Sequence, residues 1–436
     1  MNLLVSCIPY DGGKSGISVY VREVVRALLD QGHDLTLLCE PGVDEADIRQ
    51  PAADGQHPEA GCRMPNVVRV IHAPRWTRRP ILSMMWHLFM LPFWIWRHRC
   101  DFEGFVICAA NRRVCAWYPL PTAATVHDLA NFHIPGKYSR LRMFYLAHVL
   151  PHFAKKAHRL VAVSGATKTD MVKFWGCREE QVTVLYNGLP HNKKPETRLR
   201  QGYGGQARNQ KPAFAKASTF AEATVDKSAG KPETRNPPSP RLPPSPRLRW
   251  TSRRASQKPE TILYISRIEH PGKNHVRLIE AYGKLPRSLA EAHPLVMAGA
   301  DWKDAEVVHA AAARSPHSEL IRFTGFVEDI ETVWADAGFY VFPSLFEGFG
   351  LSLVEAMVRG IPCACSNNGS LGEIAGDVAV TFDPESVDDI AAALDLLLTE
   401  PEQERSARVA RGLEHVKRFS WKDHAAGIVR LLEGVA

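Results

Sequence analysis

Residues 342–362 read FPSLFEGFGLSLVEAMVRGIP, and this stretch decides the fold. The apolar run that ends near Pro343 predicts a buried strand, and the apolar spacing after Gly350 predicts a helix that ends at Gly360. Because Gly348 and Gly350 carry no side chain, a ligand can come close to the loop between them. The free N–H groups and the dipole at the start of the helix favour an anion, so this strand–loop–helix unit predicts a phosphate site.

Two glutamates frame this loop at the spacing E-x7-E. Glu355 follows Gly350 by five residues, which places it roughly 7–8 Å along the helix axis. That separation suits a diphosphate at the helix start and a ribose beside Glu355, whose carboxylate accepts hydrogen bonds from two vicinal hydroxyls. Taken alone, a helix glutamate such as Glu355 is usually just solvated. The pair of Glu347 and Glu355 around G-F-G-L is a far less common pattern.

The sequence on both sides of this unit alternates apolar runs with amphipathic stretches. In residues 260–415, apolar runs such as TILYIS at 261–266 alternate with helical patterns. Residues 1–191 repeat the alternation, and Val21, Val24, Val25 and Leu28 mark the buried face of their first helix. Such alternation predicts two α/β domains, each with a parallel sheet covered on both faces. Ligands of such sheets bind beyond the carboxyl ends of the strands, which predicts a cleft between the domains.

Residues 192–259 interrupt this pattern. KPETR occurs at 194–198 and again at 231–235, and PPSPRL occurs twice between 237 and 248. We predict a disordered, low-complexity insert, because this composition cannot bury enough apolar surface to offset its ordering entropy. Residues 194–259 hold 15 Lys and Arg against 4 Asp and Glu, which gives this segment a charge of +11. Because the whole chain has a net charge of +7, the rest of the chain has a net charge of −4. A mildly acidic globular part does not indicate a nucleic-acid partner.

A second candidate segment is SRIEHPGKNH, residues 266–275, directly after a predicted strand. Arg267 and Lys273 lie at the carboxyl end of that strand and face the same cleft. Two fixed cations there could neutralise a leaving diphosphate, whereas the alternative is a pair of ordinary surface cations. The sequence contains no D-x-D, the usual metal anchor for nucleotide-diphosphate sugars. We therefore expect a site without a metal ion or other cofactor.

The first domain contributes TVHDL, residues 125–129, at the end of another predicted strand. His127 is our candidate for a catalytic group, and a histidine of the core or the surface is the alternative. The opening GGKS, residues 12–15, is not a phosphate-binding P-loop, because the first glycine of that motif would fall at Ile8 within an apolar run. We interpret it as a glycine-rich turn between a strand and a helix.

The apolar stretch ILSMMWHLFMLPFWIW, residues 81–96, raises the question of a membrane. Its sixteen residues fall short of the roughly 20 that a spanning helix needs. Two interpretations remain besides a span: a helix buried in the first domain, or a surface helix in the bilayer interface, with flanking arginines toward lipid phosphates. Nine scattered cysteines without a C-x-x-C pair, and a start without a basic leader, lead us to expect a cytoplasmic protein, with the inner face of a membrane as its alternative place.

Together, EGFGLSLVEAM, SRIEHPGKNH, TVHDL, VAVSGATKTDM, LYNGL and SGISVYVREVVRALLDQGHDLTLL resemble the family-four retaining glycosyltransferases of the GT-B fold, also called group 1. The resemblance covers most of residues 1–191 and 260–425. It implies two Rossmann-like domains whose parallel sheets face across a cleft, with the acceptor on the first domain and the donor sugar on the second. Residues 416–436 would form a C-terminal helix that packs back toward the first domain.

The resemblance also implies roles for single residues. Arg267 and Lys273 would hold the donor diphosphate, Glu347 the sugar and Glu355 the ribose. His127 would face the sugar near the reacting carbon. In this family the acceptor would attack the sugar on the same face as the leaving group, and no side chain here is an obvious base. The donor would further contact the backbone amides from Phe349 to Leu351, with Gly348 and Gly350 beside them, and Gly16 in the loop after the first strand. The sequence departs from the family in its insert and in the extra Lys14-Ser15 of the first loop.

The resulting expectation is a retaining, metal-independent hexosyltransferase. It would move a hexose, with mannose or rhamnose suggested by the HDL variant, from a nucleotide-diphosphate sugar to a glycan or lipid-linked acceptor in cell-surface polysaccharide synthesis. Two alternatives stay open at this point. One is a non-catalytic relic that binds a nucleotide sugar and is inactivated by the insert, and the other is a sugar-nucleotide epimerase of the same fold.

Overall fold

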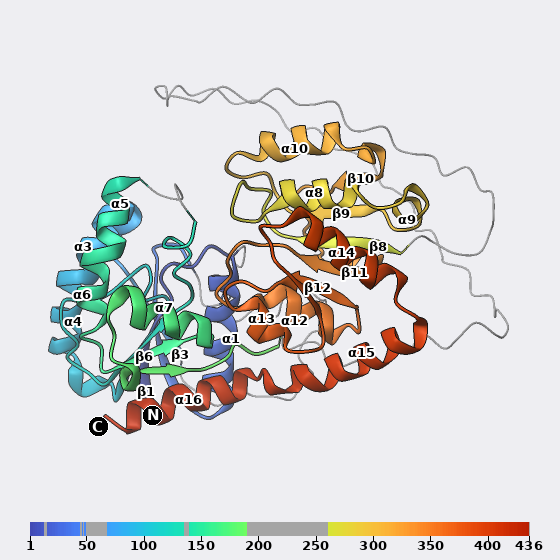
Figure 1. Ribbon diagram of the computed structural model, residues 1–436. Coiled ribbons are helices and arrows are strands. Elements are labelled where there is room, and N and C mark those ends of the chain that lie inside the picture. The colour runs from blue at the N-terminus through green and yellow to red at the C-terminus, as the bar shows by residue number, and fades with distance from the viewer. Residues whose placement is uncertain are drawn as a thin grey trace, which may run out of the picture. The chain divides into compact units, whose positions relative to one another are not determined.

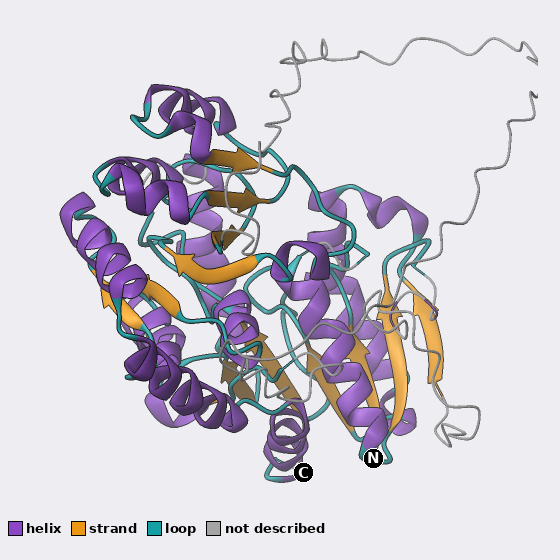
Figure 2. Ribbon diagram, turned by 90° about the vertical axis from the view of Figure 1, so that its right-hand side faces the viewer, coloured by secondary structure: helices purple, strands orange, loops and turns teal. Residues whose placement is uncertain are grey.

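The computed structural model describes residues 1–12, 15–43, 46, 48, 68–134, 139–189 and 260–435. The predicted insert at 192–259 lies outside the described residues, as do Gly13 and Lys14 of the first loop. The described chain builds two parallel sheets with helices on both faces of each (Figures 1 and 2). We call the part formed by residues 1–189 the N-terminal lobe and the part formed by residues 260–415 the C-terminal lobe.

The N-terminal lobe is built on a sheet with the strand order β3-β2-β1-β4-β5-β6-β7, in which every pairing is parallel. Leu3, Leu4 and Val5 in β1 are fully buried, as expected of a parallel strand covered on both faces. The strands are β1 (Asn2–Ser6), β2 (Asp34–Cys39), β3 (Val68–His72), β4 (Gly104–Ile107), β5 (Thr122–Val126), β6 (Arg159–Ala162) and β7 (Val182–Val184).

The helices of this lobe include two that contain a π-helical turn. The α-helices are α1 (Gly16–Asp30), α3 (Pro80–Met85), α4 (Leu91–Arg97), α5 (Arg140–Phe144), α6 (Leu150–Ala154) and α7 (Gly165–Trp175). The π turns are η2 (Trp86–Met90) and η4 (Tyr145–Val149), and the short 3-10 helices are η1 (Arg75–Arg78), η3 (Arg99–Asp101) and η5 (Glu179–Gln181).

The C-terminal lobe repeats the design with the order β10-β9-β8-β11-β12-β13. In both sheets the first strand lies between the second and the fourth, so the strand order reverses between β1 and β4 and between β8 and β11. Loops diverge at such a point and leave a crevice for a ligand. The strands are β8 (Thr261–Ile265), β9 (Leu295–Ala298), β10 (Ile321–Phe323), β11 (Ala337–Phe342), β12 (Cys363–Ser366) and β13 (Val380–Phe382).

The helices of the C-terminal lobe continue into the C-terminal segment. They are α8 (His275–Gly283), α9 (Arg287–Ala292), α10 (Ala305–Arg314), α11 (Glu331–Trp334), α12 (Leu351–Val358), α13 (Leu371–Ala375), α14 (Val387–Thr399), α15 (Glu402–His415) and α16 (Trp421–Glu433), with the 3-10 helices η6 (Ser318–Leu320) and η7 (Val416–Arg418).

Helix α16 packs on the N-terminal lobe although it follows the C-terminal one (Figure 1). Gln31 donates to the carbonyl of Lys422 at 2.9 Å, and Leu432 lies so close to Gly104 that a Cβ there would come within 2.9 Å of its Cδ1. The chain thus crosses from one lobe to the other twice, once in each direction, which ties the two lobes together.

Residues 81–96 form α3, η2 and most of α4, a helical segment with two different faces. One face is buried against the lobe through Trp86, Leu88, Leu91 and Ile95, whereas the opposite face is exposed and still apolar. The buried face matches the interpretation as a helix of the core, and the exposed apolar face matches the interpretation as a surface helix. None of the helices in the described part of the chain is long and apolar enough to cross a membrane.

Candidate active site

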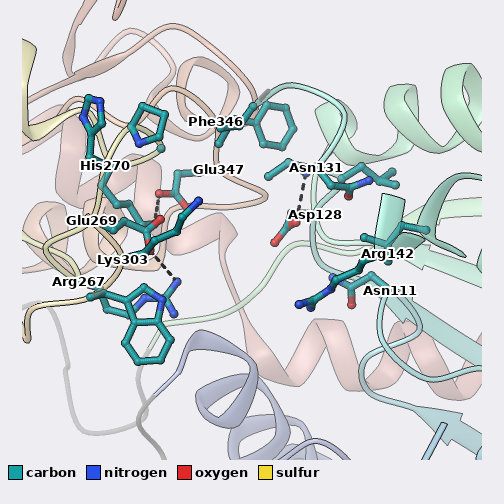
Figure 3. Close-up of a pocket in the computed structure, with 18 of the residues that line it drawn as sticks. Asn111, Asp128, Asn131, Arg142, Arg267, Glu269, His270, Lys303, Phe346 and Glu347 are labelled. Carbon is teal, nitrogen blue, oxygen red and sulfur yellow. Dashed lines mark hydrogen bonds and ion pairs between the residues drawn. The ribbon is translucent and has the colours of Figure 1, made fainter. Parts of the chain in front are cut away.

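A cavity of about 530 Å³ opens between the lobes, at the carboxyl ends of strands of both sheets. On the C-terminal lobe it lies at the reversal of strand order, among loops after β8, β9 and β11. Loops after β4 and β5, together with residues of α5, η4 and α7, form the N-terminal wall. Figure 3 shows Arg267, Glu269 and Glu347 on one side, facing Asn111 and Asp128 on the other. Of the residues expected in the site, the cavity wall includes Arg267, Lys273 and Glu347.

An ion pair stands at the centre of the C-terminal wall. The Nζ of Lys273 donates to Oε1 of Glu347 at 2.6 Å, and the two side chains are 21% and 18% exposed. Burial alone would lower the pKa of Lys273. The negative charge of Glu347, together with Tyr264 and Glu269, has a larger combined effect in the other direction, so the pKa lies above its ordinary value. Lys273 is therefore a permanent cation, and its ammonium position is fixed by a carboxylate in the cavity.

The backbone around this pair is also held in place. Tyr264, a buried residue of β8, donates its hydroxyl to the carbonyl of Lys273 at 2.9 Å. The carbonyl of Glu347 accepts from both the amide and the hydroxyl of Ser370, at 3.2 and 3.0 Å. Neither partner of the ion pair is thus left to a free loop, which suits a site that has to be ready before its ligand arrives.

Arg267 is the second cation of this wall. Its guanidinium lies 3.4 Å from the carboxylate of Glu269 and 5.2 Å from the ring centroid of Trp302, which lies on the loop after β9. The side chain is 55% exposed, so a ligand can reach it without displacing the protein core. Contact with an aromatic ring limits its rotamers and keeps the guanidinium available for an anion such as a phosphate, which it can bind through two N–H groups.

Helix α12 begins directly behind these side chains. Gly350 precedes it with φ +92°, a left-handed conformation that favours glycine, and Leu351 is its first residue. On the opposite lobe Gly16 is the first residue of α1, and a Cβ on it would lie 3.8 Å from Cδ1 of Leu351. The starts of two helices, each with a positive dipole end, thus approach the same place from both lobes.

Gly348 fills a different role from the one its sequence suggests. We expected it to make room for a ligand, but its nearest neighbour is the backbone of the other lobe: a Cβ here would lie 1.8 Å from the carbonyl oxygen of His127. The hydroxyl of Thr167 in α7 bridges the contact, at 3.4 Å from the carbonyl oxygens of both His127 and Gly348. The missing side chain at 348 is therefore what lets the two lobes meet.

His127 is buried and is not part of the cavity wall. Its Nε2 donates to the carbonyl of Cys108 at 2.7 Å, and its ring meets that of Tyr20 edge-on at 4.6 Å. Burial lowers its pKa to about 4, so the ring is neutral at neutral pH. The next residue, Asp128, lines the cavity instead, and its Oδ1 accepts from the amide of Ala130 at 3.2 Å.

Glu355 and Phe349 also lie outside the cavity wall. Glu355 lies in the second turn of α12 and is half-buried. The ring of Phe349 is buried between the lobes, with ring centroids 6.4 Å from Tyr186 and 5.4 Å from Phe419. Because the ring of Phe349 is buried, only the backbone of this loop is available to a ligand at the start of α12.

A second contact between the lobes involves Glu373 of α13. Its carboxylate accepts from the amides of Gly165 and Ala166 at the start of α7, at 2.8 and 3.0 Å, and from the hydroxyl of Tyr186 at 2.7 Å. A carboxylate at a helix N-terminus accepts hydrogen bonds from free N–H groups and is attracted by the positive end of the helix dipole. This side chain therefore joins the C-terminal lobe to the N-terminal lobe beside the cavity.

Several residues of the N-terminal wall were not singled out from the sequence. Buried polar atoms on both walls have no hydrogen-bond partner among the described residues, and such atoms are rare unless a ligand or water satisfies them. They are Asn111 Oδ1, Asn131 Nδ2, Trp175 Nε1 and His270 Nδ1. Arg112 and Arg142 add positive charge to the N-terminal wall. The position of Asn131, four residues after His127, is the signal that could have found it.

Two family models match the sequence in series. The model described as Glycosyltransferase Family 4 matches residues 14–193, and the model described as Glycosyl transferases group 1 matches residues 249–412. Each covers one lobe, and together they cover more than three quarters of the chain.

Curated relatives are similar over part of their length. The chain is 39% identical over 164 residues to the O-antigen chain mannosyltransferase B of Escherichia coli, a match that covers 37% of this chain and 42% of the relative. It is 32% identical over 181 residues to a phosphatidyl-myo-inositol mannosyltransferase of Mycolicibacterium smegmatis, covering 40% of this chain and 45% of the relative. The chain thus spans less than half the length of either relative.

Solved structures share the fold at low sequence identity. The Anabaena protein Alr3699/HepE, in complex with UDP and glucose, superposes with a TM-score of 0.62 at 16% identity and full coverage of both chains. A sucrose-phosphate synthase from Thermosynechococcus elongatus gives a TM-score of 0.64 at 15% identity, covering all of this chain and 99% of its own. These confirm the predicted fold of two Rossmann-like domains with parallel sheets. With both family models matched in order along its two lobes, the chain belongs to the group 1 glycosyltransferases, family four, of the GT-B fold.

Proposed function

We propose that the protein transfers a hexose, with mannose as the first candidate, from a nucleotide-diphosphate sugar to a glycan or lipid-linked acceptor in cell-surface polysaccharide synthesis. The observation that carries this proposal is the fixed pair of Lys273 and Glu347, next to Arg267, on one wall of a cavity between two lobes. Mannosyl transfer is favoured because both curated relatives described above are named as mannosyltransferases.

The C-terminal wall would hold the donor. Arg267 and Lys273 would neutralise the diphosphate as it leaves. The loop from Gly348 to Gly350 and the start of α12 at Leu351, which lie next to the cavity wall in the chain, would offer backbone amides to the same phosphates. Glu355, one turn further along the helix, would accept hydrogen bonds from the ribose. Because Glu347 is already oriented by Lys273, its carboxylate would receive the hydroxyls of the transferred sugar in a defined position.

The N-terminal wall would hold the acceptor. Asn111 and Asn131 belong to the cavity wall, and each has a buried amide atom without a partner among the described residues. Asp128 adds a carboxylate to the same wall, and amides with a carboxylate match the alternating donors and acceptors of a sugar. His127 would act as a positioning residue rather than as an acid or base, because its ring is hydrogen-bonded to Cys108 behind the wall. Its carbonyl fixes where the loop at Gly348 comes to rest.

The chemistry proposed is a substitution that retains the anomeric configuration. The bond between the anomeric carbon and the donor phosphate oxygen breaks, the acceptor oxygen forms its bond on the same face, and the acceptor proton passes to the departing phosphate. The two cations would stabilise the negative charge that develops on that phosphate, which is the role a divalent ion has in other transferases. The proposal therefore includes a reaction that needs no metal ion and no further cofactor.

The place of action is part of the same proposal. The protein would work in the cytoplasm, at the inner face of a membrane, where a lipid-linked acceptor is presented. The exposed apolar face of the segment 81–96 supports a membrane contact.

The experiment that tests the function is a substitution of Lys273. Nucleotide sugars would first be screened for protection against heat, and turnover of the protecting donor would then be measured for wild type and Lys273→Ala. Loss of one pre-positioned cation from a site of this kind is expected to lower kcat by about 10²–10³-fold. Lys284→Ala is the matched control, since Lys284 is a paired, half-exposed cation of the same lobe outside the cavity.

Three results would count against the proposal. Undiminished turnover in Lys273→Ala, with a melting curve like that of wild type, would remove the cation from the mechanism. Turnover of the donor in the absence of any acceptor would instead identify an epimerase. Chelators should leave the rate unchanged, and their abolishing it would refute the metal-independent reaction.

A further inference from the structure

A second hollow lies on the N-terminal lobe, away from the cavity just described. It is an open groove of about 600 Å³ between the carboxyl ends of β2 and β3, the segment η2–α4 and the loop after β4. Its walls come from Leu38, Ile71, Trp86, Phe93, Trp94 and Trp117, with only His72 and Arg97 as charged or titratable groups. Pockets that bind small molecules have volumes of about 300–1,000 Å³, and this groove lies within that range. A groove with so few polar atoms selects a ligand without hydrogen-bonding groups, such as a hydrocarbon chain.

The surface around the groove is apolar as well. Along α3, η2 and α4, side chains that point away from the core remain exposed, among them Ile81 at 71%, Phe93 at 59%, Met90 at 55% and Trp96 at 46%. Isolated exposed apolar residues are ordinary, but a contiguous set of this kind on one segment marks an interaction surface. We call this set, with the groove, the aromatic face.

The charge around the aromatic face has a single sign. Residues 68–100 contain six arginines and no aspartate or glutamate. Those nearest the exposed apolar side chains are themselves exposed: Arg75, Arg78, Arg79, Arg97 and Arg99. The guanidinium of Arg99 lies 5.3 Å from the ring centroid of Trp96, so its charge is held at the edge of the apolar surface. An apolar face ringed by arginines complements an anionic lipid bilayer, which offers both negative headgroups and a hydrocarbon interior. An acidic protein surface would pair with the arginines but would not bury the apolar side chains.

The neighbouring helices extend the same chemistry. Figure 1 shows α5 and α6 on the same side of the lobe as α3 and α4. The loop after β4 joins the two sets, since the amide of Ala116 donates to the carbonyl of Leu88 in η2, and the hydroxyl of Tyr118 donates to the carbonyl of Phe153 in α6. Phe144 is 58% exposed in this region, and residues 129–169 again contain no acidic side chain.

We propose that the aromatic face docks on an anionic lipid bilayer and that the groove takes up one hydrocarbon chain of a membrane lipid. The arginines would lie at the level of the phosphates, with Phe93 and Trp96 below them in the interface. A seated chain would add a specific, saturable contact to a contact that is otherwise non-specific. This inference concerns a lipid site and does not depend on the transfer reaction.

The position of the groove gives the docking a consequence for the cavity. A single loop, residues 108–121 between β4 and β5, places Asn111 and Arg112 in the cavity wall and Trp117 in the groove wall. A lipid chain in the groove therefore touches the same loop that forms the acceptor side of the cavity. Docking would bring this side of the protein to the bilayer surface.

The docking face is tested by flotation with vesicles of phosphatidylglycerol or phosphatidylcholine. We expect wild type to float with the anionic vesicles only. The pair Arg78→Ser and Arg79→Ser should weaken binding by about 25-fold, at about fivefold for each arginine near the surface. Phe93→Asp should weaken it by about tenfold or more, since it places a charge in the apolar interface. The matched control is Phe326→Asp, a residue of the C-terminal lobe that is 63% exposed and should change nothing.

The groove is tested separately with a spin-labelled lysophosphatidylglycerol kept below its micellar concentration. Its nitroxide, carried on the chain, should quench tryptophan fluorescence in a saturable way, because Trp86, Trp94 and Trp117 line the groove. Ile71→Phe would fill the groove from its wall without adding a tryptophan to the assay, and should weaken this binding by about tenfold or more while flotation stays intact.

Four outcomes would overturn the proposal. Flotation of Phe93→Asp like wild type would remove the face from lipid binding, and equal binding to both vesicle types would remove the arginines. Unchanged quenching in Ile71→Phe would exclude the groove as the chain site. Dimers in light scattering with no flotation at all would assign the face to a second copy of the protein. Circular dichroism and melting curves of every variant establish that each result comes from a folded protein.

Discussion

Gly348→Ala perturbs the contact between the lobes with the smallest possible change. A Cβ at this position would lie 1.8 Å from the carbonyl oxygen of His127 and 2.8 Å from its carbonyl carbon. Both are backbone atoms, which cannot rotate away as the end of a side chain can. Gly348 does not have a positive φ, so an alanine there is not strained by its own conformation. The whole effect of the substitution therefore falls on the approach of the lobes.

The size of the effect follows from this distance. To bring the new methyl group from 1.8 Å to 3.0 Å, the shortest separation that Cβ atoms show, the two backbones must move apart by at least about 1.2 Å. The C-terminal wall with Glu347, next to Gly348 in the chain, then recedes from the N-terminal wall by a similar amount. A misplacement of about 1 Å between reacting groups costs about 100-fold in rate, so kcat of Gly348→Ala is expected to fall by about that factor.

Donor affinity separates this effect from general damage. The proposed nucleotide contacts all lie on the C-terminal lobe, and alanine keeps the backbone amide, so calorimetric titration with GDP and UDP should give nearly the wild-type affinity. Gly412→Ala is the control, because it lies within α15 with nothing within 4 Å of an added Cβ. It should keep full activity and gain up to about 1 kcal/mol of stability from helix propensity. A wild-type kcat for Gly348→Ala would refute the reasoning.

Three further predictions rest on other contacts. Glu355→Ala should weaken nucleotide binding by about 10–100-fold, the value of a hydrogen bond to a charged group, and calorimetry showing unchanged affinity would remove it from the ribose site. Glu373→Ala should destabilise lobe closure by about 3 kcal/mol, since it removes a charged acceptor of three hydrogen bonds, and small-angle scattering should show a larger radius of gyration; an unchanged radius would contradict this. Burial lowers the pKa of both His127 and His424 to about 4, so their contribution to stability is complete above about pH 6.5 and is lost as the pH falls toward 4. The melting temperature should decline over this range, and less steeply in His424→Gln; parallel curves would argue against His424 as a source.

The parts of the fold that the sequence predicts are those that depend on local pattern. Strands buried on both faces appear as continuous apolar runs, such as Leu3–Val5, and the loop before α12 is marked by its glycines. Arg267, Lys273 and Glu347 could be placed in one cavity because residues that follow parallel strands gather at one edge of a sheet. The strand order, and with it the position of the crevice, follows from pairings between strands and comes from the structure.

The rest of the site depends on tertiary contacts that have no local signal. The direction of the His127 ring is set by the carbonyl of Cys108, which belongs to another strand end. Asn111 and Asn131 became candidates only because burial leaves their amide atoms without a partner among the described residues. Likewise Glu373 reads as an ordinary helix residue until α7 of the other lobe is placed against it.

A single short segment connects the C-terminal wall of the cavity to the contact between the lobes. Ser370 holds the backbone of Glu347 through two hydrogen bonds, and α13 begins at the next residue and carries Glu373 to the start of α7. Gly348, which follows Glu347 directly, rests on His127 of the same lobe as α7. The loop of Glu347 is therefore connected to the N-terminal lobe by two routes, through Gly348 and through Ser370 and Glu373. Movement of the lobes cannot leave Glu347 in place, so the position of this carboxylate in the cavity is coupled to closure itself.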